Sequence, residues 1–153
     1  MITNDVLRSV RYMLDLSDAH VVSIIAMADY EASQEDVAAW LKKEEEEGFA
    51  ECPAVALAHF LDGLVIFKRG KNENPPAEPP KLSVSNNMVL KKLRVAFELK
   101  EENLHEIMEA AGFKISKPEL SALFRKEGHK NYRPCGDQFL RNFLKGLTLC
   151  IRG

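Results

Sequence analysis

The chain lacks the long apolar runs that mark membrane proteins. No stretch of its 153 residues reaches the 18 or more apolar side chains that a membrane-spanning helix requires. Its first ten residues, MITNDVLRSV, also lack the apolar region and the small-residue cleavage site of a secretory signal peptide. We therefore expect a cytoplasmic protein with no membrane partner.

Cysteine and histidine are few, and their spacing does not favour catalysis or metal binding. Cys52, Cys135 and Cys150 are odd in number and form no CxxC pair, so reduced thiols are expected. Cys52 and Cys135 each precede an expected helix, where a thiol pKa can be lowered. However, the four histidines form no HExxH or other ligand spacing, and none is placed to act as a base. All three cysteines are therefore expected to be small buried apolar residues.

Other signals of enzymes and of β-structure are also missing. The sequence has no glycine-rich phosphate loop, no GxSxG and no carboxylate pair at a defined spacing. No stretch alternates strictly between apolar and polar residues, and no Asn-Gly or Asp-Gly turn lies between strand-like runs. We predict an all-α protein that is not an enzyme, with no catalytic, cofactor-binding or metal-binding residues and no cofactor.

The net charge of −2 hides an asymmetry between the two halves of the chain. Residues 1–70 carry 6 Lys/Arg and 13 Asp/Glu, whereas residues 71–153 carry 15 and 10, giving −7 and +5. The first half has the wrong sign for binding nucleic acid. The second half, taken alone, has the right one.

The chain contains an internal repeat with a period of 83 residues. Without a gap, this shift aligns residues 4–70 with 87–153 and brings identical residues together, among them Asn4/Asn87, Arg11/Arg94, Ser33/Ser116, Cys52/Cys135, Gly63/Gly146 and Arg69/Arg152. Residues 71–86, KNENPPAEPPKLSVSN, contain four prolines and are predicted to be a linker. We therefore expect an acidic repeat over 1–70 and a basic repeat over 87–153.

Each repeat is predicted to form four helices from its apolar period and its capping signals. Asn4 and Asn87 are expected to be the N-caps of the first helix. The second helix is expected over 18–28 and 101–111, the third after Ser33 or Ser116, and the fourth after residues 52–53 or 135–136. Gly63 and Gly146 interrupt the apolar fourth helix, which suggests that another backbone crosses closely there.

The second and third helices of the second repeat form a helix-turn-helix-like pair. The match is loose, because the turn after Gly112 is two residues longer than in the common DNA-binding pattern. Basic and polar residues nevertheless cluster on and after the third helix, where they could contact phosphates and base edges: Lys117, Ser121, Arg125, Lys126, Lys130 and Arg133. These residues could instead solvate the outer face of a helical bundle. Tyr132 could stack on a base or anchor its loop.

The equivalent face of the first repeat is acidic. It contains the run Glu44–Glu47, which would repel phosphate, so only the second repeat is expected to contact DNA or RNA. The acidic run could also complement the basic face of the second repeat. The alternative function is therefore a protein-protein interaction module, or a homodimer, that uses the two opposite faces.

Five strings of the chain closely resemble the YehS-like family of small, uncharacterised bacterial proteins. They are NDVLRSVRYMLDL, AMADYEASQEDVAAWLKKE, LDGLVIFKRG, SKPELSALFRK and HKNYRPCGDQFLRNFLKGL. The resemblance covers nearly the whole chain. It implies a bacterial cytoplasmic protein with two tandem copies of an all-helical domain, and it transfers no catalytic or binding residues.

Overall fold

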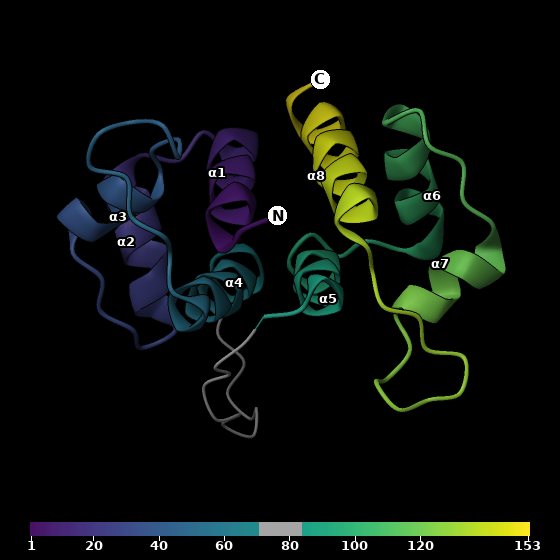
Figure 1. The fold of residues 1–153 in the computed structure, drawn as a ribbon. Helices are drawn as coiled ribbons and strands as arrows, with labels where there is room; N and C mark the ends of the chain where they lie inside the picture. Colours follow the sequence, from purple (N-terminus) through teal and green to yellow (C-terminus); the bar gives the residue numbers. More distant parts are fainter. Residues whose placement is uncertain (71–83) are drawn as a thin grey trace. The chain divides into compact units, whose positions relative to one another are not determined.

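The computed structural model describes residues 1–70 and 84–153, and within these ranges it contains α-helices and no strand (Figure 1). The chain divides into two units, Met1–Val84 and Ser85–Gly153. The first contains α1 (Thr3–Leu14), α2 (Asp18–Met27), α3 (Gln34–Trp40) and α4 (Ala54–Arg69). The second contains α5 (Asn86–Ala96), α6 (Glu101–Ala110), α7 (Lys117–Leu123) and α8 (Asp137–Arg152). The predicted all-α tandem repeat is confirmed.

Most of the predicted linker, 71–86, lies outside the described residues. Its last two residues belong to the second unit: Ser85 is the N-cap of α5 and accepts a hydrogen bond from the amide of Met88, and Asn86 is the first helical residue. Across the described part of the chain, no helix is both long enough and apolar enough to span a membrane.

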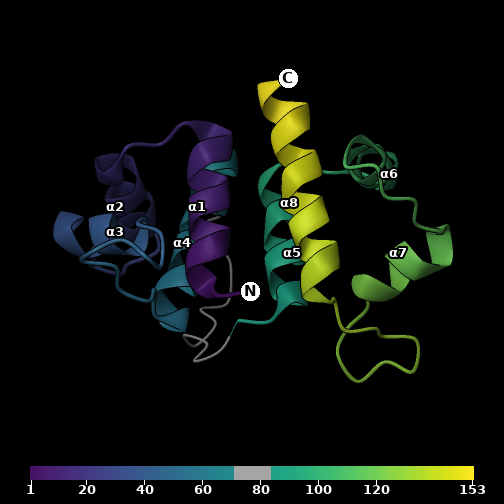
Figure 2. The same ribbon diagram turned by 45° about the horizontal axis from the view of Figure 1, so that its top comes forward.

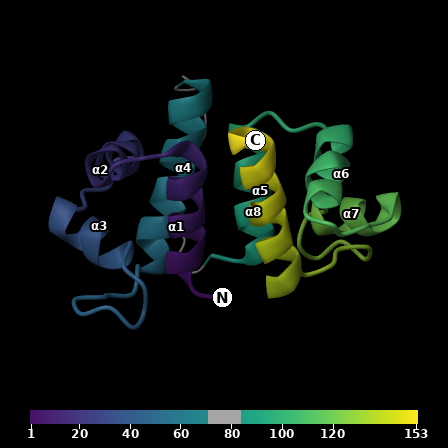
Figure 3. The same ribbon diagram turned by 90° about the horizontal axis from the view of Figure 1, so that it is seen from above.

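The two units repeat the same helix packing. In the first, α4 packs against α2 and also contacts α1; in the second, α8 packs against α6 and also contacts α5 (Figure 3). The fourth helix of each unit supplies much of the core, with Phe60, Leu61 and Leu64 on α4 and Phe143, Leu144 and Leu147 on α8. These helices are therefore the centre of each unit.

The two helix crossings require glycine. A Cβ atom built on Gly63 would overlap the backbone carbonyl of Ile24 in α2, and one built on Gly146 would overlap the carbonyl of Ile107 in α6. Glycine is unfavourable inside a helix, but here it is the residue that lets two backbones touch. The close crossing predicted from the sequence is confirmed in both units.

The predicted N-caps of the first helices are wrong. The N-cap of α1 is Ile2 and that of α5 is Ser85, so Asn4 and Asn87 are each the second residue of their helix. Both asparagines are buried, 1% and 5% exposed. They cap nothing because their side chains point into the core, where they bond to backbone groups far along the chain.

The cysteines divide into two groups. Cys52 and Cys135 are buried, as predicted, whereas the prediction for Cys150 is wrong, since it lies exposed near the end of α8. Burial raises the pKa of the Cys52 and Cys135 thiols to about 12, which outweighs any effect of the following helix. Both thiols are therefore protonated at neutral pH.

Candidate nucleic-acid interface

The candidate interface is built on the segment between the third and fourth helices of the second unit. We call residues 124–134 the basic loop and the equivalent residues 41–51 the acidic loop. In the basic loop the amides of His129, Tyr132 and Arg133 donate to the carbonyls of Lys126, His129 and Ala122. The acidic loop makes the same three bonds at positions 46, 49 and 50, so the two loops share much of their backbone framework.

A buried asparagine holds each loop at both ends. Asn87 Nδ2 donates to the carbonyls of Leu123 and Arg133, each at 2.9 Å, and Asn87 Oδ1 accepts from the amide of Cys135 at 2.8 Å. Asn4 makes the same three bonds, to the carbonyls of Trp40 and Ala50 and the amide of Cys52, at 3.0, 2.8 and 2.9 Å. The position of the basic loop is therefore set by the core of its unit.

The first helix of the second unit supports the basic loop at one further point and the residues that follow the loop at another. Lys91 donates from Nζ to the carbonyl of Arg125 at 3.3 Å. Asn86 Nδ2 donates to the carbonyl of Cys135 at 2.9 Å and to Oδ1 of Asp137 at 2.8 Å. The bond from Asn86 lowers the pKa of the Asp137 carboxyl.

Five of the six predicted contact residues line one hollow. It has a volume of about 890 Å³ and lies between the start of α6, the outer side of α7 and the basic loop. The five predicted residues in its lining are all exposed: Lys117, Ser121, Arg125, Lys130 and Arg133. We call this the large hollow. Figure 2 shows the short α7 and the long loop that follows it.

The sixth predicted residue, Lys126, lines an adjoining hollow of about 380 Å³, which we call the small hollow. The two hollows share Glu101, Ser121 and Arg125. The structure therefore brings all six predicted residues to one continuous region of the second unit.

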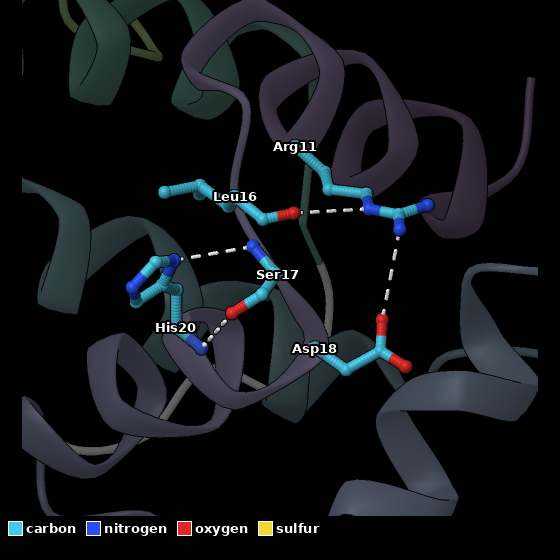
Figure 4. A network of polar contacts seen from close by, with 5 residues as sticks. All are labelled: Arg11, Leu16, Ser17, Asp18 and His20. Carbon is cyan, nitrogen blue, oxygen red and sulfur yellow. Dashed lines mark hydrogen bonds and ion pairs between the residues drawn. The ribbon is translucent and has the colours of Figure 1, made fainter.

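Arg94 also lines the small hollow, and sequence analysis did not select it. Its guanidinium carbon lies 4.8 Å from the centre of the Phe124 ring, and its Nε donates to the carbonyl of Leu99 at 3.1 Å. The equivalent Arg11 also donates from Nε to a carbonyl, that of Leu16, but its guanidinium forms an ion pair with Asp18 at 3.8 Å (Figure 4). Because the sequence has arginine at both positions, it gave no sign that one guanidinium would lie on an aromatic ring and the other would form an ion pair.

The lining of the large hollow is mixed in charge. Glu101 and Glu119 contribute carboxylates, and Glu101 Oε1 lies 3.9 Å from Nζ of Lys117. The Lys117 side chain is 78% exposed, so this pair is weak and leaves the ammonium available to a ligand. The Glu119 carboxylate accepts a hydrogen bond from the Ser116 hydroxyl at 2.7 Å. The hollow can thus offer hydrogen-bond acceptors beside its cations.

The first repeat lacks three of these cations. At the positions of Lys117, Lys130 and Arg133 it has Gln34, Glu47 and Ala50, whereas lysines occupy the positions of Arg125 and Lys126. All four carboxylates of Glu44–Glu47 are exposed. The acidic and basic loops therefore share a backbone framework but differ in the charge that they present to solvent.

The described residues contain no group of three or more His, Cys, Asp or Glu side chains that could hold a metal ion. His20 accepts a hydrogen bond through Nδ1 from the amide of Ser17, a capping interaction at the start of α2 (Figure 4). Trp40 is buried, and Tyr132 is half-buried in the lining of the large hollow.

Comparison with known proteins identifies the repeat unit. The family model "Protein of unknown function (DUF1456)" matches the chain twice, over residues 3–70 and 86–153. An Escherichia coli (strain K12) protein, "Uncharacterized protein YehS", is 50% identical over 97% of this chain and 95% of its own length. Neither description mentions nucleic acid or a helix-turn-helix, and no solved structure matches. The chain belongs to the DUF1456 family and carries two tandem copies of its domain.

Proposed function

We propose that this is a non-enzymatic cytoplasmic protein that binds nucleic acid through the basic face of its second repeat. The observation that carries the proposal is the gathering of Lys117, Arg125, Lys126, Lys130 and Arg133, all exposed, around two adjoining hollows. Clustered Lys and Arg side chains favour phosphate, because each contact releases counterions from the nucleic acid. Ser121 lies among them and can reach a base edge or a sugar.

The comparison between the repeats supports a binding role over a purely solvating one. Both loops are held by a buried asparagine and share backbone hydrogen bonds. The fold therefore does not require positive charge at Lys117, Lys130 and Arg133, where the first repeat has Gln34, Glu47 and Ala50. The acidic loop meets the same structural demands with four glutamates. Lys117, Lys130 and Arg133 are therefore available for a task other than folding.

Fluorescence anisotropy with a mixed-sequence labelled oligonucleotide, as single strand and as duplex, tests the proposal. We expect binding at about 50 mM salt that weakens towards 200 mM, with a log–log slope near −3.6 for a duplex and −2.8 for a single strand if about four phosphates are contacted. Reversing Arg125 and Lys126 to Glu is expected to abolish binding. The matched control reverses the exposed Arg141 and Lys145 of α8, which line neither hollow, and should retain most of the affinity. Absence of binding, or equal losses in both variants, would refute the proposal.

A second candidate function is association between copies of the chain through the acidic and basic loops. It is favoured by the exposure of Glu44–Glu47 at the position equivalent to the basic loop. Sedimentation at low and high salt distinguishes the two functions. A dimer that dissociates in high salt, together with no affinity for nucleic acid, supports the association and excludes the leading proposal.

A further inference from the structure

We infer that the ligand of the second repeat is a single strand, DNA or RNA, whose unpaired bases enter the large hollow. This inference rests on the proposed function and narrows it. It follows from the shape of the site, from the chemistry of its lining and from the position of one aromatic side chain.

The site is an open hollow, and the helix beside it, α7, is short. A duplex is read by a helix or β-ribbon that protrudes into its major groove. α7 has seven residues, a length of about 10 Å, and Lys117 is its only basic residue. The other cations lie beyond it on the basic loop, around the hollow. A hollow cannot enter a groove, whereas it can receive bases that project from a single strand.

The mixed lining matches exposed base edges better than a phosphate backbone alone. Glu101 and Glu119 would repel phosphates, but their carboxylates can accept hydrogen bonds from the amino groups of cytosine or adenine. Those amino groups are available to a protein from all sides only when the bases are unpaired. The exposed cations Arg125, Lys130 and Arg133 then serve the backbone of the same strand.

Tyr132 places an aromatic ring in the lining of the hollow. Stacking of bases on aromatic rings beside a basic groove is the usual way in which proteins hold single strands. The equivalent residue of the first repeat is Phe49, which shows that the fold accepts a phenyl ring at this position. Tyr132→Phe is therefore a conservative control, and Tyr132→Leu removes the ring while keeping an apolar side chain.

The test compares one labelled strand of about 16 nucleotides with the duplex that it forms with its complement, using the full chain. We expect the single strand to bind at least about tenfold more tightly than the duplex. Tyr132→Leu should weaken the single strand by about 5- to 100-fold, and Tyr132→Phe should leave its affinity nearly unchanged. Circular dichroism confirms that each variant is folded.

The outcomes separate this inference from the proposed function. If the duplex binds as tightly as the single strand and still depends on Arg125 and Lys126, the proposed function stands and the single-strand inference is overturned. An affinity for single strands that survives Tyr132→Leu undiminished also overturns the assignment of bases to the large hollow. If neither form binds, both proposals fail.

Discussion

At the scale of single residues, two buried asparagines connect the core of each repeat to its variable loop. Asn4 and Asn87 each satisfy two carbonyls and one amide, and among the described residues no buried side-chain nitrogen or oxygen lacks a hydrogen-bond partner. Their bonds span 36 to 48 positions of sequence. Sequence reasoning assigned them to caps, because a local signal cannot reveal a partner that far along the chain.

Replacing these asparagines should destabilise both repeats but affect binding in only one. Asn87→Ala removes the partner of three backbone groups, two of them in buried bonds, which costs about 2–4 kcal/mol of unfolding free energy, and Asn4→Ala should cost a similar amount. Urea denaturation measures the two losses. Under conditions where both variants are folded, only Asn87→Ala should weaken binding to nucleic acid, since it alone releases the basic loop. Equal effects on binding would contradict this assignment.

The thiols give a second prediction at this scale. With a thiol reagent at pH 8, the exposed Cys150 should react at once, while Cys52 and Cys135 react only after unfolding. Immediate reaction of two or three thiols would contradict the burial.

The same burial makes stability depend on pH. The buried thiols have a pKa near 12 against an ordinary value of 9.0, so the folded state holds more protons than the unfolded state between these values. The stability of each repeat should therefore fall as pH rises above about 9.

At the scale of the elements, the crossing of the second helix over the fourth defines each repeat. Gly63 and Gly146 were recognisable in the sequence, because glycine inside a strongly apolar helix is unfavourable unless a close neighbour requires it. The helix positions could also be predicted, because apolar periodicity and capping serines are local signals in the sequence. The packing of Arg94 on Phe124 and the hollows beside α7 depend on tertiary contacts, and no local pattern encodes them.

Gly146→Ala should strongly destabilise the second repeat. In an exposed helix this change gains about 1 kcal/mol, but here the added methyl group meets the backbone of Ile107, so we expect a net loss of about 2–3 kcal/mol or more. Gly136→Ala is the matched control in the same unit. Gly136 has a negative φ and open space around it, so its replacement should change stability by about 1 kcal/mol at most. Chemical denaturation of the two variants checks the difference.

At the scale of the whole molecule, duplication has produced two copies of one fold with opposite surface charge. The repeat, its all-α class and its family were readable from the sequence, because an 83-residue shift aligns the core positions and the loop anchors together. The six candidate contact residues could also be chosen from sequence, because they are basic or polar and cluster on and after the third helix, and at Lys117, Lys130 and Arg133 the first repeat lacks the charge. Their arrangement around hollows emerged only from the structure.

The central claim is that binding requires the charges that the second repeat has and the first repeat lacks. The most direct test exchanges them: Lys117→Gln, Lys130→Glu and Arg133→Ala give the second repeat the residues found at the equivalent positions 34, 47 and 50. Because the fold already carries these residues in its first copy, the urea midpoint of the variant should stay close to that of the unaltered chain. An anisotropy titration across salt should then show much weaker binding, with a slope flattened by about 2 to 3. Unchanged affinity and slope in this folded variant would contradict the account.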